Sequence, residues 1–148
     1  MNPRAQAELD AALAATVEDM RLAATELAAV LEAEREALAG ADVEAIDRIG
    51  ARKQSLMQQL EQYDAERVQL AAATPAGAER LRPAWRATLD ALAVCRERNQ
   101  QNGALAGQRL AQVRRALAVL TGEPAGDGVY GRGGELRAAT RSQVLAQA

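Results

Sequence analysis

The sequence of 148 residues has no histidine, no phenylalanine and only one cysteine, Cys95. Without histidine it lacks the side chain that most often serves as a general base, and one cysteine can form neither an intramolecular disulfide nor a zinc-binding cysteine pair. No stretch approaches the roughly 18 uninterrupted apolar residues that span a membrane, and the first residues lack the apolar region of a secretory signal. These absences predict a cytoplasmic protein without a metal, a cofactor or membrane insertion.

Carboxylates remain as potential acid–base groups, but their placement argues against an enzyme. Glu18 and Asp19 are adjacent, and Glu34 and Glu36 are two residues apart. On a helix, such neighbours point in different directions and are typical of solvated faces. We therefore predict no catalytic residues.

The apolar residues follow a helical repeat. Aromatic residues make up 2% of the chain, so its core must be built from thin leucine, valine and alanine layers between close helices. Asn2 and Pro3 predict the start of a first helix, and Gly40 its C-cap. The stripe of this helix, spaced alternately by four and three residues, is Leu13, Val17, Met20, Ala24, Leu27, Leu31, Glu34 and Leu38.

A second helix is predicted from Asp42, an N-cap residue. Because the connection is short, the first two helices should be antiparallel neighbours. We expect Lys53 and Arg67 to cover apolar surface with their stems while their charged ends reach water. The second stripe is Ile46, Ile49, Lys53, Leu56, Leu60, Tyr63, Arg67 and Leu70.

Two prolines mark the next break. Thr74-Pro75 and Arg82-Pro83 each offer a helix start, and a third long helix is predicted from about Pro83 until Gly122 and Pro124. Its stripe is Trp85, Thr88, Leu92, Cys95, Asn99, Asn102, Ala106, Arg109, Val113, Leu117 and Leu120. The fold class is thus all-α: an antiparallel long-helix hairpin plus a third long helix in a coiled-coil-like bundle over residues 1–121.

Charge differs between the first and third predicted helices. Residues 1–39 contain eight acidic residues and three arginines, whereas residues 79–115 contain eight arginines and three acidic residues. Complementary flanks favour pairing within the bundle. The alternative, an RNA-binding arginine face, is less favoured because the arginines lack nearby aromatic residues for stacking on bases. No nucleic-acid partner is predicted.

Residues 122–148 form a separate predicted region, a glycine-rich tail with a short amphipathic segment. It has too little apolar surface to fold alone, which suits it to bind a partner helix. Tyr130, among five glycines, would be an anchor with few torsions to restrict. The expected cargo-binding residues are Val129, Leu136, Thr140, Val144 and Leu145.

The third stripe is polar at its centre. Asn99 and Asn102 place two amides on a face that should be buried, and Gly103 weakens the helix next to them. Two interpretations remain open: a polar layer that fixes the register of the helices, as a buried asparagine does in coiled coils, or a groove where a partner meets the amides.

In order and length, the chain resembles the FlgN-type flagellar export chaperones. The resemblance depends on the long leucine-rich hairpin, the leucine-rich end of the third helix and the glycine-rich tail. The residues that carry it are Trp85, Cys95, Asn99, Asn102, Gly103, Leu117, Leu120, Tyr130 and Gly134.

The resemblance implies a cytoplasmic, non-enzymatic, all-helical chaperone. Its partners would be the hook-filament junction proteins, whose C-terminal helical segments are bound chiefly by the chaperone's C-terminal region. The tail tyrosine of the family, which assists docking to the cytoplasmic domain of the flagellar export gate, corresponds to Tyr130. We expect a monomer or weak dimer. The alternative function is a structural coiled-coil adaptor that oligomerises through its helical face.

Overall fold

The computed structural model describes residues 2–122, and these are helical with no strand. The elements are α1 (Pro3–Gly40), α2 (Val43–Ala73), α3 (Pro75–Arg80) and α4 (Arg82–Thr121). This confirms the all-α prediction. The chain divides into two compact units at Asn99, and residues 2–99 and 100–122 are therefore described separately.

The helix starts agree with the capping residues in the sequence. The Asn2 side chain accepts a hydrogen bond from the backbone N–H of Arg4 at 3.0 Å, and that of Asp42 accepts one from Ala45 at 3.2 Å. The predicted C-cap was wrong by one residue: Ala41, with φ 53°, adopts the left-handed conformation that closes α1. Its N–H donates to Leu38 at 3.3 Å. These hydrogen bonds to the last carbonyls of the helix offset the strain at Ala41.

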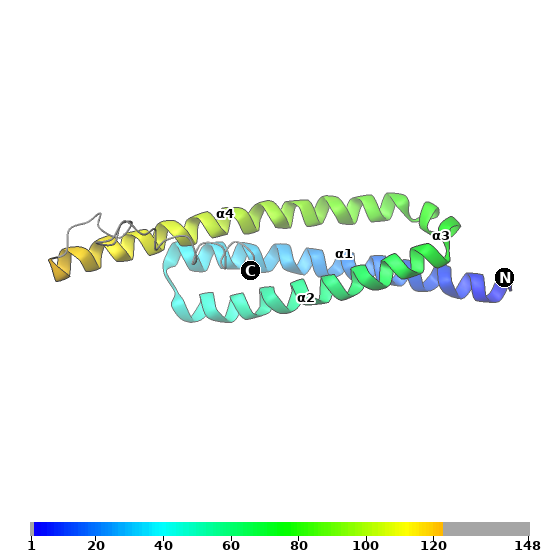
Figure 1. Ribbon diagram of the computed structural model, residues 1–148, viewed down its shortest axis with the longest axis horizontal. Helices are drawn as coiled ribbons and strands as arrows, with labels where there is room; N and C mark the ends of the chain where they lie inside the picture. The colour runs from blue at the N-terminus through cyan, green and yellow to red at the C-terminus, as the bar shows by residue number, and fades with distance from the viewer. Residues whose placement is uncertain (1, 123–148) are drawn as a thin grey trace, which may run out of the picture. The chain divides into compact units, whose positions relative to one another are not determined.

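The helices α1 and α2 form the predicted antiparallel hairpin (Figure 1). All eight positions of the first stripe are buried, from Ala24 with 0% exposure to Leu38 with 8%. In the second stripe Leu56 is fully buried, whereas the other seven positions are half-buried. The core of residues 2–99 is therefore centred on α1, and the stripe of α2 contributes one fully buried residue and seven half-buried residues.

A polar cluster fastens the short helix α3 to the start of α1. Gln6 donates to the Thr74 hydroxyl at 2.6 Å and to Asp10 at 3.1 Å. Thr74 and Arg80 also donate to the Asp10 carboxylate. Gly77 lies buried against this cluster, where a Cβ would be 2.7 Å from the Thr74 hydroxyl oxygen. The close approach of α3 to Asp10 therefore depends on a residue without a side chain at position 77.

The first part of α4, up to Asn99, runs alongside α1 (Figure 1). It also contacts α2 through the Lys53–Asn99 hydrogen bond and the Arg67–Trp85 stacking. The Cys95 thiol is 3.4 Å from the carbonyl oxygen of Ala24, and Arg98 donates to the carbonyl of Ala28 at 3.3 Å. Both contacts join residues about seventy positions apart, so this part of α4 runs parallel to α1. It is consequently antiparallel to α2.

The expected charge pairing between the first and third helices has a mixed outcome. Arg80, in α3, pairs with Asp10 of α1. Arg82 instead pairs locally with Glu79, and Arg98 donates to a backbone carbonyl. Glu26 of α1 pairs with Arg52 of α2. Pairing therefore follows individual helix contacts rather than the summed charge of each helix.

Candidate protein-binding site

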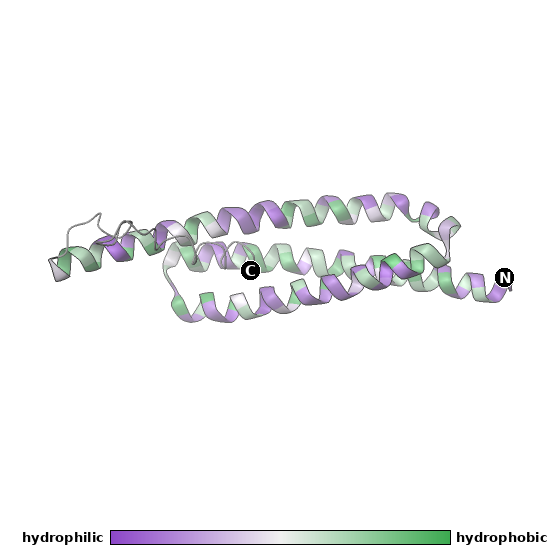
Figure 2. Cartoon of the chain, in the orientation of Figure 1, coloured by the Kyte–Doolittle hydropathy of each residue, from purple (hydrophilic) through white to green (hydrophobic). Residues whose placement is uncertain are grey.

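The last turns of α4 carry a row of exposed apolar side chains. Leu110 is 45% exposed, Val113 55%, Leu117 54% and Leu120 82%. Their spacings of three, four and three residues place them on one face of the helix. Figure 2 shows hydrophobic residues recurring along α4 into these turns. We call these four residues the α4 row. Val113, Leu117 and Leu120 belong to the predicted third stripe, and in residues 100–122 this end of the stripe is exposed.

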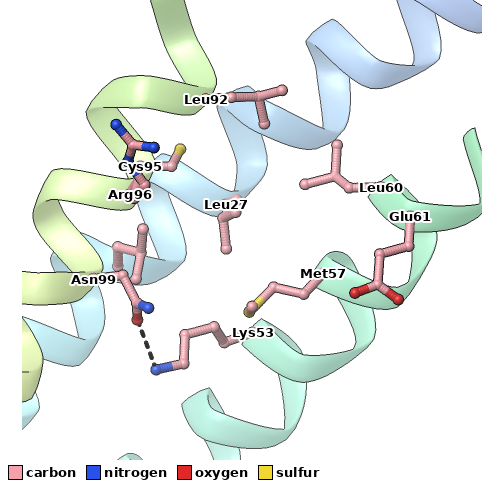
Figure 3. Close-up of a pocket in the computed structure, with 10 residues that line it drawn as sticks. Leu27, Lys53, Met57, Leu60, Glu61, Leu92, Cys95, Arg96 and Asn99 are labelled. Atoms are coloured by element: carbon pink, nitrogen blue, oxygen red, sulfur yellow. Dashed lines mark hydrogen bonds between the residues drawn. The ribbon is translucent and has the colours of Figure 1, made fainter. Parts of the chain in front are cut away.

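A second feature, within residues 2–99, is a polar layer of Glu34, Lys53 and Asn99. The Lys53 ammonium is 2.9 Å from a Glu34 carboxylate oxygen and donates to the Asn99 side-chain oxygen at 3.1 Å (Figure 3). The Glu34 side chain is 9% exposed and that of Lys53 is 19% exposed. The prediction that Lys53 directs its charge to water was therefore wrong, because an acidic partner lies inside the bundle.

Arg67, the other basic residue of the second stripe, covers an aromatic ring. Its guanidinium lies 3.9 Å from the centre of the Trp85 ring and pairs with Asp64 at 2.8 Å. The charged end of Arg67 therefore interacts with an acid and a ring, and its side chain is 19% exposed, whereas the prediction directed this charge to water.

Cys95 is a core residue. It is 3% exposed and packs with Leu27, Leu31 and Leu56. Burial raises the pKa of its thiol, opposed by the positive charge of Arg98. A protonated, covered thiol is a poor nucleophile, which agrees with the interpretation of Cys95 as a small apolar residue.

The predicted site residues fall in three places. Asn99 lies in the polar layer. Asn102 is 3% exposed, interacts with another group of the chain and belongs to the unit that begins at Gln100. The predicted residues of the tail lie outside the described residues: Val129, Tyr130, Leu136, Thr140, Val144 and Leu145. Sequence reasoning missed the pairing of Glu34 with Lys53, although each interrupts an apolar stripe and that interruption was the available signal.

The described residues form helices, and the last turns of α4 carry an exposed apolar row. In residues 2–122, no group of three or more His, Cys, Asp or Glu side chains is placed to hold a metal ion. None of the helices in this part of the chain is long and apolar enough to cross a membrane.

The family model described as FlgN protein matches residues 1–138. The chain belongs to the FlgN family. Comparisons with curated proteins and with solved structures gave no match. FlgN proteins are chaperones of flagellar export and assembly and are not enzymes, so the role of this chain is to bind flagellar proteins. The match includes the whole hairpin, the α4 row and part of the tail.

Proposed function

We propose that this FlgN protein acts in the cytoplasm, binds the C-terminal helical segments of the hook-filament junction proteins and delivers them to the export gate. The observation that carries the proposal is the α4 row, from Leu110 to Leu120, which is exposed on one face of a helix. Large apolar side chains at helical spacing are the complement of an amphipathic partner helix. Burying each of them contributes about 1.5–3 kcal/mol before the costs of association.

The tail completes the proposed site. Val129, Leu136, Thr140, Val144 and Leu145 follow the α4 row in sequence, so one cargo segment can bind both. In this proposal the tail residues add contacts that form only with cargo, which keeps binding reversible because their ordering costs part of the interaction energy.

Calorimetry with the C-terminal segment of a junction protein tests the α4 row. Leu117→Glu should weaken binding by about tenfold or more, because it places a charge in the proposed apolar contact. Leu22→Glu is the matched control, since Leu22 of α1 is 52% exposed and lies outside the row. Equal affinities of the two variants would remove the α4 row from the cargo site.

Tyr130 is proposed to dock the loaded chaperone on the cytoplasmic domain of the export gate. Tyr130→Ala should weaken docking of the cargo complex while leaving helical content and most of the cargo affinity unchanged. Calorimetry with the purified gate domain measures this. Equal docking by the native chain and by Tyr130→Ala would exclude a docking role for Tyr130. A parallel loss of cargo binding in Tyr130→Ala would place this residue in the cargo site.

The α4 row also favours a second candidate function, a coiled-coil adaptor that self-associates. Its spacing is that of a coiled-coil seam, but it has only four positions, and a stable coiled coil generally needs about three or four heptads. We therefore propose a monomer or weak dimer without a nucleic-acid partner. Light scattering that shows a stable oligomer, lost in Leu117→Glu, would favour the adaptor instead.

A further inference from the structure

A cavity opens between α1, α2 and the first part of α4. Its volume is about 270 Å³, and all the residues that line it lie within residues 2–99 (Figure 3). In Figure 3 the side chains of Leu60 and Leu92 point toward each other across it, and Leu27 lies between the helices. The apolar lining is Leu27, Leu31, Met57, Leu60, Leu92 and Cys95.

Two polar bridges join α2 and α4, one at an end of this cavity and one beyond the residues that line it. One is the hydrogen bond of Lys53 to Asn99, and the other is the stacking of Arg67 on Trp85. On α2 the residues that line the cavity run from Lys53 to Glu61, which are eight residues apart, about 12 Å along a helix. The opening is therefore about two turns long, and the Lys53–Asn99 hydrogen bond closes one of its ends.

The size of the cavity limits what can enter it. An α-helix is about 10–12 Å across with its side chains, too wide for the space available. A cavity of about 150 Å³ holds one benzene molecule, so this one accepts about two aliphatic side chains. Two such side chains project from one helix face when they are three or four residues apart. A helix resting on the opening could thus insert two of its residues.

The rims of the opening carry opposite charges. Glu61 lines the cavity from α2 and Arg96 lines it from α4, and both residues are exposed. A helix lying between them is complementary when a basic residue flanks its apolar face on the α2 side and an acidic residue flanks it on the α4 side. Turning the helix end for end exchanges its flanks, so this charge pattern also selects its direction.

We propose that this opening is a docking groove for an amphipathic helix of a partner protein, which inserts two large apolar side chains and carries an acidic flank against Arg96 and a basic flank against Glu61. The groove uses residues of the hairpin and of the first part of α4, and none from the α4 row or the tail. The proposal is therefore independent of the proposed cargo site.

Methionine NMR on the full chain tests occupancy of the groove. The probe is a synthetic 18-residue helical peptide with leucines along one face, glutamates on one flank and lysines on the other. With ¹³C-labelled methionine methyl groups, this peptide should shift the Met57 signal, because Met57 lines the cavity. The Met20 signal should not move, since Met20 is 2% exposed and does not line the cavity.

The control peptide has the same composition with its leucines distributed around the helix. It should leave Met57 unchanged. The proposal is wrong if neither peptide moves Met57 at millimolar concentration, or if both move it equally. It is also wrong if a small apolar molecule such as p-xylene moves Met57 while the amphipathic peptide does not.

Exchange of the rim charges tests the direction of the helix. Glu61→Lys and Arg96→Glu should each weaken peptide binding by about two- to fivefold, because each gives both rims the same sign. The double variant restores opposite rims in reverse order, so it should bind with nearly native affinity in the opposite direction. If the two losses simply add in the double variant, the charges do not orient a helix.

An apolar wall residue gives the largest expected loss. Leu92→Glu should weaken peptide binding by at least tenfold, whereas Val94→Glu should not. Val94 is on the same helix, is 45% exposed and does not line the cavity. Circular dichroism measures whether both variants are folded. If Leu92→Glu is unfolded, the methionine experiment on the native chain decides the proposal. Equal binding by two folded variants would overturn the proposal.

Discussion

Two rows of residues in this chain have the same spacing and opposite exposure. The stripe of α1 is at most 8% exposed at every position, including the charged Glu34. The α4 row is 45% to 82% exposed. Both alternate spacings of three and four residues. The repeat therefore identifies which face of a helix is apolar, and a second fact is needed to tell whether the chain itself or another protein covers that face.

The largest expected effect compares one leucine from each row. Leu31→Ala should lower the free energy of unfolding by about 2–5 kcal/mol, because Leu31 is 1% exposed and its removal leaves a cavity. Leu117→Ala should cost less than about 0.5 kcal/mol in the absence of cargo. Urea unfolding followed by circular dichroism measures both. Similar losses would mean that Leu117 is covered within the chain.

A charge test addresses Glu34, the polar member of the α1 stripe. Lys53→Met removes the ammonium that pairs with this carboxylate and should cost about 2–3 kcal/mol, less than for a fully buried pair because the Lys53 side chain is 19% exposed. Adding Glu34→Leu should recover at least half of that loss. Urea unfolding of the two variants decides the point. A double variant no more stable than Lys53→Met would mean that the carboxylate tolerates the loss of the Lys53 ammonium.

A smaller effect is expected where the first turns of α1 meet α3. Gly77→Ala should cost about 1–3 kcal/mol, because the new methyl group would meet the Thr74 hydroxyl oxygen at 2.7 Å and contact Asp10 more closely still. Gly50→Ala is the matched control: no atom lies within 4 Å of its added Cβ, and it should stabilise α2 by about 0.5–1 kcal/mol. Thermal unfolding measures whether each variant is less or more stable than the native chain. A stabilising Gly77→Ala would show that the cluster can move aside.

The smallest effect is a pH dependence from Asp10. The hydrogen bond from Thr74, assisted by Gln6 and Arg80, holds the pKa of Asp10 below its ordinary value of 3.8. A lowered pKa in the folded state stabilises the fold above that value, and this contribution is lost as the pH falls through the folded pKa. The melting temperature of the native chain should therefore fall more steeply than that of Asp10→Asn below about pH 4. If the melting temperatures of the two proteins fall in parallel with pH, Asp10 does not contribute to the pH dependence of stability.

Local sequence signals accounted for most of the fold. Asn2 and Asp42 cap helices as predicted, and the α1 stripe is buried at every position. These features depend on residues within a few turns of one another, which a single sequence contains. The left-handed residue at Ala41 escaped prediction because glycine at position 40 satisfied the same preference one residue earlier.

The groove and the exposure of the α4 row could be predicted less well from the sequence. Pairing of Lys53 with Glu34 depends on how α2 is aligned against α1, and the groove depends on which side chains of α2 and α4 face each other. The apolar stripes indicate which face of each helix is apolar, but they do not determine how the helices are aligned against one another. The exposure of the α4 row was missed for a related reason, since a bundle stripe and a docking row have the same pattern.

The central claim is that the chain covers the first row and a cargo protein covers the second. Amide hydrogen exchange of the full chain, with and without the C-terminal segment of a junction protein, tests it directly. Without cargo, amides of residues 110–121 should exchange faster than those of the α1 stripe, and saturating cargo should slow the former while leaving the latter unchanged. Unchanged exchange in residues 110–121 at saturating cargo would contradict the account.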